Sequence, residues 1–277
     1  MDKKFIVKII ILLFTFCVLF GILKKIFFLD NETKVEMEDI GEWLLVDDYD
    51  SKNSSFEKFL KQKDSYDILK QTYEMLKETY GDQYYDVSRQ DLGYLGKFPG
   101  GEELVSGGKD AMNQEINDQI VSPLLSLQVS SNFTAQKGLE GMLEAGTVLE
   151  EQDYQKNADQ MIPVLAGASF KNVFKIGDTF QGKYLGEKDM MFEIKGFLKD
   201  DAEVSLEGEE ISLNRTLVFP SIVWSQKDPK EFQKTLLSVK CQGYLHYDNK
   251  KELQNHMKKL KKIKKQTGFR YIIPEIK

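Results

Sequence analysis

The sequence predicts an α+β protein in which one N-terminal transmembrane helix precedes a folded domain. Three observations predict this class. An apolar segment occupies residues 5–28, and strand periodicity alternates with helix periodicity through the rest of the chain. The composition, 41% hydrophobic and 30% charged over 277 residues, is that of a globular chain with one or two domains.

The N-terminal segment "FIVKIIILLFTFCVLFGILKKIFF" (residues 5–28) is long enough to cross a bilayer. Its ~20 apolar positions cover a core of about 30 Å at a rise of 1.5 Å per residue. A cleaved signal peptide has a shorter core and a small-residue cleavage site, whereas residues 24–29 are bulky. We therefore expect residues 1–29 to be an uncleaved anchor. Lys3, Lys4 and Lys8 precede the apolar core, whereas Lys24 and Lys25 follow it. The free amino terminus then favours a cytoplasmic N-terminus, with residues 30–277 outside the cytoplasm.

The apolar segment and the remainder of the chain differ in net charge. Residues 1–29 hold five lysines and one aspartate, so the remainder carries a net charge of −10. A surface of this sign does not suit nucleic acid, which we exclude as a partner. Cys17 lies in the apolar segment and Cys241 far beyond it, so no intramolecular disulfide is predicted.

The first half of the domain opens with strand and helix patterns. After a polar stalk, residues 43–46 indicate a strand, and residues 83–89 indicate another. Between them Ser65 is predicted to cap a helix that Gly81 ends. The apolar positions of this helix recur at helical spacing and are Leu69, Tyr73, Leu76 and Tyr80. A glycine-dense stretch from 93 to 108 predicts a loop or junction.

The second half continues this alternation. Residues 120–130, 216–220, 236–247 and 269–273 indicate strands, and residues 135–143 a short helix. A longer helix is predicted over residues 250–266, with an apolar stripe of Leu253, Met257, Leu260 and Ile263. Lysines cover the rest of this helix. They either dock on anionic lipid headgroups or form an ordinary solvated face.

Residues Gly177–Lys183 ("GDTFQGK") satisfy the first seven positions of the phosphate-binding pattern G-x-x-x-x-G-K-[ST]. The eighth residue is Tyr184, whose phenol cannot place a small hydroxyl on Mg²⁺. The pattern also requires a helix, whereas Phe192 and Ile194 alternate with polar residues as in a strand. The stretch therefore predicts a β-hairpin and no nucleotide site.

No other motif in the sequence indicates catalysis or metal binding. His246 and His256 lie ten residues apart, without the spacing of a zinc site, and no nucleophile motif surrounds Cys241. We expect no catalytic, cofactor-binding or metal-binding residues, no cofactor, and a protein that is not an enzyme.

Four segments resemble one known family. They are Gln83–Gly96 ("QYYDVSRQDLGYLG"), Phe133–Tyr154, Ile162–Leu198 ("IPVLAG…KIGDTF…MFEIKGFL") and Leu213–Pro220 ("LNRTLVFP"). In this order they are similar to the extracytoplasmic core domain of FtsX-like, MacB-type ABC transporter permeases, in the branch associated with bacteriocins and antimicrobial peptides. The third segment is the most specific of the four.

The resemblance implies a MacB-like core over residues 30–277, with a strand-helix lobe (30–110 and 214–277) and an inserted β-rich lobe (111–213). It also implies an accessory of an ABC transporter complex, with a permease and an ATP-binding subunit as partners. Such permeases continue into further membrane helices, whereas this sequence ends at Lys277. We therefore expect a stand-alone accessory, half of a split permease or a truncated gene product. The alternative is an extracellular binding module for an antimicrobial peptide or envelope ligand.

Overall fold

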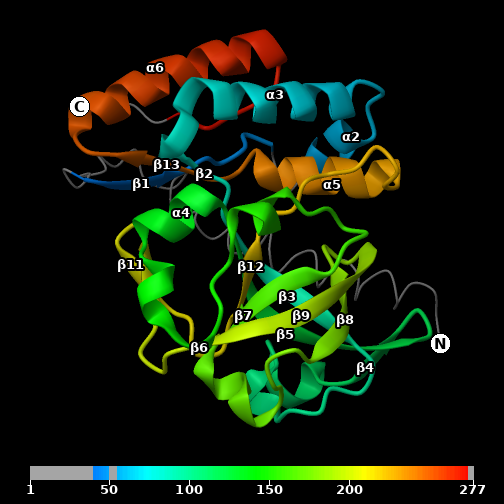
Figure 1. Cartoon of the computed structure of the whole chain (residues 1–277). Helices are drawn as coiled ribbons and strands as arrows, with labels where there is room; N and C mark the ends of the chain where they lie inside the picture. Colours follow the sequence, from blue (N-terminus) through cyan, green and yellow to red (C-terminus); the bar gives the residue numbers. More distant parts are fainter. Residues whose placement is uncertain (1–39, 50–54, 274–277) are drawn as a thin grey trace. The chain divides into compact units, whose positions relative to one another are not determined.

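The computed structural model describes residues 40–49 and 55–273, which form two compact units (Figure 1). The barrel unit comprises Val87–Ser205 and Glu210–Asp228. The helix unit comprises the described residues up to Asp86, the segment Leu206–Glu209, and the described residues from Pro229 onward. Residues 87–110 and 214–228, assigned from the sequence to the strand-helix lobe, belong to the barrel unit.

A closed six-stranded β-barrel forms the centre of the barrel unit. Its sheet contains β3 (Ser88–Leu95), β4 (Gln114–Ile116), β5 (Gln119–Val129), β6 (Leu143–Gly146), β7 (Ile162–Ala166), β8 (Thr179–Tyr184), β9 (Lys188–Leu198) and β12 (Leu217–Pro220). The ring follows the order β12-β7-β9-β8-β3-β5, and a parallel pairing between β12 and β5 closes it. β4 extends the sheet along β5, and β6 pairs with β9. Closure gives every strand of the ring a neighbour on both sides.

Aromatic rings from separate strands meet inside the barrel. Phe219 of β12 lies with its ring centroid 5.8 Å from Tyr184 of β8 and 5.5 Å from Phe192 of β9. Because β12 neighbours neither β8 nor β9 in the ring, these contacts pass through the interior. All three side chains are fully buried, and burial of each stabilises the fold by about 2 kcal/mol.

The nucleotide-pattern residues lie in the hairpin of β8 and β9, which confirms the hairpin prediction. Lys183 forms an ion pair with Asp189 across the two strands. A Cβ on Gly182 would approach the Phe192 ring to 2.8 Å, so glycine is what allows this ring to cover β8. The match of residues 177–183 to the phosphate-binding pattern therefore reflects packing inside the barrel.

Short elements connect the barrel strands. The helical ones are η2 (Glu102–Leu104), η3 (Gly108–Ala111), α4 (Ser131–Gln136), η4 (Leu139–Met142), η5 (Glu151–Gln155) and η6 (Ala168–Asn172). A separate two-stranded hairpin consists of β10 (Glu203–Leu206) and β11 (Glu209–Ser212). Its turn residues, Glu207 and Gly208, both have positive φ, as a tight hairpin turn requires. The Glu207 carboxylate accepts a hydrogen bond of 3.1 Å from the Leu44 amide.

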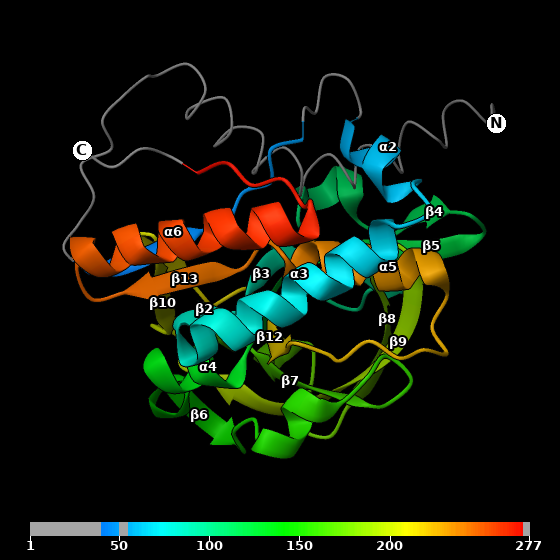
Figure 2. The same cartoon turned by 90° about the horizontal axis from the view of Figure 1, so that it is seen from above.

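The helix unit packs helices on a small antiparallel sheet. The sheet has the order β1-β13-β2 and comprises β1 (Gly41–Leu44), β13 (Tyr244–Tyr247) and β2 (Tyr84–Tyr85). The helical elements are α2 (Ser55–Leu60), α3 (Ser65–Tyr80), η1 (Gly81–Gln83), α5 (Lys230–Lys240) and α6 (Lys250–Thr267). α3 packs against both α5 and α6, and Figure 2 shows α3 and α6 running beside each other.

The two long helices confirm their sequence predictions, except that the N-cap of α3 is Asp64 and not Ser65, which is the first residue of the helix. α3 buries Leu69, Tyr73, Leu76 and Tyr80 and ends where Gly81 has φ of 55°. Asn249 caps the start of α6, where its side chain accepts a hydrogen bond from the Glu252 amide (3.0 Å), and Gly268, with φ of 79°, caps its end. Asparagine before the first turn and a left-handed glycine after the last satisfy the helix ends.

The fold class expected from the sequence, an α+β MacB-like core behind a transmembrane helix, was wrong. The described residues form a mixed helix-and-strand structure that contains a closed barrel. Closure depends on pairing Ser126–Val129 with Leu217–Pro220, which are far apart in the chain. Local periodicity shows each strand by itself and carries no signal for such a pairing.

The predicted anchor, residues 1–29, lies outside the described residues. Within residues 40–49 and 55–273, no helix combines the length and the apolar character needed to cross a bilayer.

Four local predictions also differ from the structure. Residues 83–89 were predicted as one strand, but β2 ends at Tyr85 in the three-stranded sheet and β3 begins at Ser88 in the barrel. Residues 236–247 were predicted as strand, but α5 extends to Lys240 and only Tyr244–Tyr247 is strand. The helix predicted over 135–143 is divided between α4 and η4. The strand predicted over 269–273 reduces to a single bridge between Tyr271 and Asp47. Residues 236–240 are helical because α5 starts earlier, at Lys230. This start places Phe232, Leu236 and Lys240 on one buried face.

Candidate functional site

The helix unit contains a surface pocket of about 360 Å³. This volume lies in the range of ~300–1,000 Å³ that is typical of small-ligand sites. The lining residues come from the segment after β1, from α2, from α3 and from the segment after α6, and are Tyr49, Ser55, Lys58, Phe59, Gln62, Ile68, Gly268 and Arg270.

Two chain segments that are distant in sequence build one wall of the pocket. The left-handed Gly268 turns the chain after α6, so that residues 270–272 run antiparallel to residues 46–48. Backbone hydrogen bonds of 2.9 Å join the Asp48 amide to the Arg270 carbonyl and the Ile272 amide to the Val46 carbonyl. This pairing brings Tyr49 and Arg270 together.

Aromatic rings form the floor of the pocket. Tyr49 stacks on Phe59 with centroids 4.8 Å apart and an interplanar angle of 27°. Phe269 meets the edge of the Tyr49 ring at 5.7 Å. Tyr49 is 6% exposed and Phe59 4%, so neighbouring side chains hold both rings in place. Only the small exposed part of these rings is open to the pocket, where it can contact an apolar group of a ligand.

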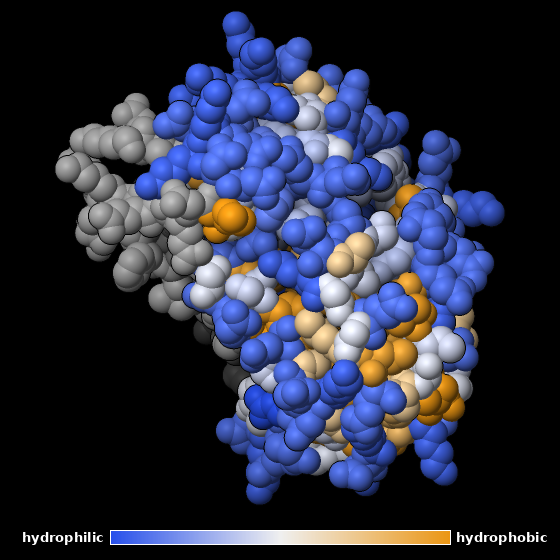
Figure 3. Space-filling view, turned by 60° about the vertical axis from the view of Figure 1, so that its left-hand side comes forward, coloured by the Kyte–Doolittle hydropathy of each residue, from blue (hydrophilic) through white to orange (hydrophobic). Residues whose placement is uncertain are grey.

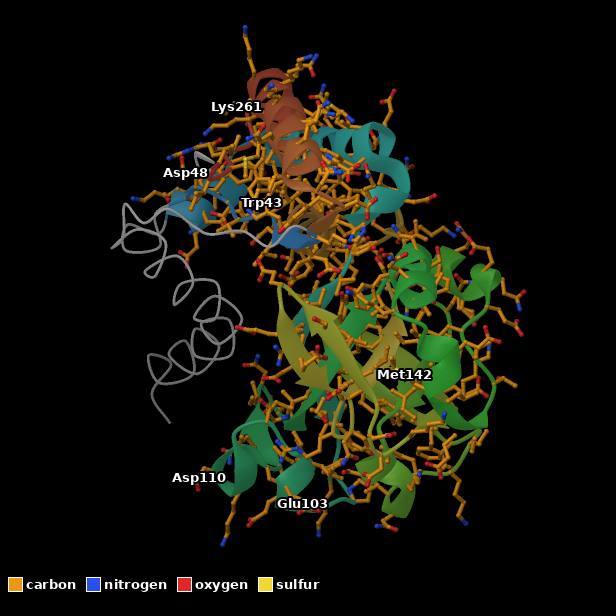
Figure 4. All side chains as sticks on the ribbon, turned by 90° about the vertical axis from the view of Figure 1, so that its left-hand side faces the viewer. Trp43, Asp48, Glu103, Asp110, Met142 and Lys261 are labelled. Atoms are coloured by element: carbon orange, nitrogen blue, oxygen red, sulfur yellow. The ribbon has the colours of Figure 1, made fainter. Side chains whose placement is uncertain are left out.

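Cationic groups stand at the rim. The guanidinium carbon of Arg270 lies 5.2 Å from the Tyr49 ring centroid, a cation–π distance. Asp48 partly balances this charge, because its Oδ2 lies 3.5 Å from Arg270 Nη2 (Asp48 is labelled in Figure 4). Lys58 is exposed and makes no ion pair with any residue that the structure describes. The pocket therefore offers positive charge beside an aromatic floor.

The tyrosine of the pocket is a weak proton donor. Burial raises the pKa of Tyr49 to about 12, although the neighbouring Arg270 acts in the opposite direction. At neutral pH the hydroxyl is therefore protonated. Ser55 is the other hydroxyl of the lining, and no histidine lines the pocket. This set of groups suits binding better than acid–base or nucleophilic chemistry.

The two histidines lie close together, and their contacts are those of residues that support the fold. The His256 Nε2 atom lies 3.0 Å from the His246 carbonyl oxygen, and the Tyr80 ring covers His256 with centroids 5.1 Å apart. Burial lowers the pKa of His256, which favours its neutral form. Among the described residues, no cluster of three or more histidine, cysteine or acidic side chains has metal-binding geometry.

A second group of polar side chains is buried in the helix unit. Lys240 Nζ lies 2.6 Å from Asp86 Oδ2, and the Tyr73 hydroxyl donates a 2.9 Å hydrogen bond to the same carboxylate oxygen. Burial raises the pKa of the neighbouring Cys241 thiol, so this thiol is a weak nucleophile. Because Lys240 and Cys241 are fully buried, this group stabilises the fold and does not meet a ligand.

A third polar group lies inside the barrel. Gln128 Oε1 accepts hydrogen bonds from the Tyr184 hydroxyl and, at 3.2 Å, from the Ser88 hydroxyl. Gln90 and Gln128 are buried, and the Nε2 atom of each has no hydrogen-bond partner among the described residues. Because these side chains are buried among the strands of the ring, we assign this group to barrel packing.

Sequence reasoning missed the pocket. The one local signal was the cluster of aromatic and basic residues in α2, which includes Lys58 and Phe59. Arg270 lies more than 200 positions away, and only the Asp47–Tyr271 bridge places it beside Tyr49.

Comparison with known proteins found no match: no family model, no curated protein and no solved structure is similar to this chain.

Proposed function

We propose that this protein is a membrane-anchored, extracytoplasmic binding module whose pocket captures the carboxyl terminus of a peptide. The observation that carries the proposal is the pocket itself, where Lys58 and Arg270 stand beside the rings of Tyr49 and Phe59. A terminal carboxylate would meet the two cations, and an apolar or aromatic last side chain would contact the exposed part of the floor. The membrane anchor is the apolar segment of residues 5–28.

Calorimetry on the full-length chain in detergent tests this proposal. A short peptide that ends in phenylalanine with a free carboxylate is compared with the same peptide carrying a C-terminal amide. We expect the amide to bind at least about fivefold more weakly, because it removes one exposed charge interaction of about 1 kcal/mol. Added salt should weaken binding of the acid more than that of the amide.

Matched variants then locate the site. Lys58→Gln and Arg270→Gln should each weaken binding of the acid, whereas Lys61→Gln, which changes an exposed lysine outside the lining, should not. Equal affinity for acid and amide would reject the proposed ligand. Equal effects of Lys58→Gln and Lys61→Gln would reject the pocket.

A second candidate function, an accessory of an ABC transporter complex, rests on the four sequence segments that resemble the permease family. In this case a permease and an ATP-binding subunit would be the partners. Crosslinking in native membranes should then capture an assembly that contains an ATPase. Repeated recovery of the uncrosslinked chain, together with peptide binding by the purified protein, would leave the binding module as the function.

A further inference from the structure

Helix α6 carries an unusual density of positive charge for a chain whose net charge is −6. Glu252 is its one acidic residue. Its lysines are Lys250, Lys251, Lys258, Lys259, Lys261, Lys262, Lys264 and Lys265. Figure 3 shows hydrophilic side chains over most of the upper part of the face drawn, while apolar side chains gather mainly in its lower part.

The exposed lysines form one face of α6, which we call the lysine face. Lys258 lies three, four and seven positions from Lys261, Lys262 and Lys265, and seven positions from Lys251. These spacings bring side chains to the same side of a helix. All five residues are exposed, and the helix buries the opposite side, comprising Leu253, His256, Met257, Leu260, Ile263 and Thr267. Figure 4 marks the position of Lys261 on α6.

The charge of this face is not neutralised within the part of the chain that the structure describes. None of Lys251, Lys258, Lys261, Lys262 and Lys265 forms an ion pair there. Lys264 and Lys259 contact other groups of the helix unit. Lys264 Nζ lies 3.9 Å from Asp48 and donates to the Tyr271 carbonyl, and Lys259 Nζ lies 5.8 Å from the Tyr80 ring centroid. With respect to residues 40–49 and 55–273, the lysine face therefore presents unpaired ammonium groups.

Two features favour a lipid surface over nucleic acid as the partner. The face contains lysines without interleaved aromatic residues, so it offers point charges for phosphate groups but no platform for bases. In addition, α6 packs on β13, and β13 pairs with β1, which begins at Gly41. If residues 5–28 insert in the bilayer, the chain from 30 to 40 holds β1 within about 40 Å of the headgroups, at ~3.5 Å per residue.

We propose that the lysine face docks on anionic phospholipid headgroups of the membrane in which the chain is anchored. This inference shares the anchor with the proposed function but does not depend on the pocket or its ligand. Each lysine near an anionic surface strengthens association by about fivefold, so several lysines acting together suffice to hold a tethered domain against the bilayer.

Lysine acylation, measured by mass spectrometry on the full-length chain in lipid nanodiscs, tests the proposal. Discs of phosphatidylcholine are compared with discs that also contain phosphatidylglycerol. We expect Lys258, Lys261, Lys262 and Lys265 to react severalfold more slowly in the anionic discs, and 0.5 M salt to abolish the difference. Lys97 and Lys109 are exposed in the barrel unit and should react equally in both kinds of disc. Equal rates at the lysine face in the two discs would overturn the proposal.

Charge reversal provides the matched variants. The variant K258E/K261E/K262E/K265E leaves Lys251 on the lysine face as a reporter, and we expect Lys251 to react equally in both discs. The variant K97E/K109E/K175E/K227E makes the same change of charge at exposed lysines of the barrel unit and should keep Lys251 protected in anionic discs. If Lys251 behaves alike in both variants, the lysine face is not the docking surface.

Two further outcomes separate the alternatives. If the chain floats with anionic vesicles but not with neutral ones, the anchor is rejected and docking is supported. Peptide binding, measured on the same sample, tests the pocket independently. Protection of the four lysines by a short DNA duplex, without protection by anionic discs, would overturn the proposal in favour of nucleic acid.

Discussion

Lys240 is a charged side chain with almost no access to solvent. It is 2% exposed, and its ammonium group pairs with Asp86, which also accepts a hydrogen bond from the Tyr73 hydroxyl. A buried ion pair adds little net stability compared with apolar packing, but the loss of one partner leaves the other charge uncompensated. The two residues therefore depend strongly on each other.

We predict that Lys240→Met lowers the free energy of unfolding by about 3 kcal/mol, because it leaves the buried Asp86 carboxylate without a cation. Urea denaturation of the full-length chain measures this loss. Lys61→Met, at an exposed lysine, is the matched control and should change stability by less than about 0.5 kcal/mol. Adding Asp86→Asn to Lys240→Met should recover part of the loss. A cost no larger than that of the control would contradict the prediction.

His256 should make stability depend on pH. Burial lowers the pKa of His256, so the folded state favours the neutral ring. The stability that follows is present above the unfolded pKa of about 6.5 and is lost as the pH falls below that value toward the folded pKa. Wild-type protein should therefore lose more stability than His256→Gln between pH 7.5 and 5.5. Glutamine can still donate a hydrogen bond to the His246 carbonyl. Urea midpoints that fall in parallel would rule out this role for His256.

At the scale of elements, helices with caps were the most predictable. α3 and α6 combine an apolar stripe with a terminal glycine of positive φ, and both signals are local. The C-terminal part of α5 was predicted as strand, because Leu236, Leu237 and Val239 fit a strand pattern when read without the turn that precedes them. The pocket requires Tyr49 and Arg270 to meet, and no local pattern encodes that contact.

The β8–β9 hairpin was also predicted, and its glycine allows a test of barrel packing. Gly182→Ala would place a Cβ 2.8 Å from the Phe192 ring and 3.1 Å from Leu92. We expect a loss of about 1–3 kcal/mol in unfolding free energy, because the barrel interior must shift to accept the methyl group. Gly141→Ala is the control, since no atom lies within 4 Å of its added Cβ. Equal unfolding midpoints for the two variants would contradict tight packing at Gly182.

At the scale of the whole molecule, the sequence reveals many of the strands but not the barrel. Strand patterns over 120–130 and 216–220 were recognised, yet their parallel pairing closes the ring only in three dimensions. The two units also interleave along the chain: the helix unit takes residues on either side of the barrel unit. Such a division depends on which surfaces pack together, and composition shifts along the sequence do not mark it.

The pairing of β1 with β13 sets an order of events during synthesis. Gly41–Leu44 is made early, but its partner, Tyr244–Tyr247, emerges only after the whole barrel unit has been made. The barrel has all its strands once Pro220 is available. Because domains fold as their chain becomes complete, the middle of the protein should acquire its structure first. The first strand then waits, unpaired, until β13 has left the ribosome.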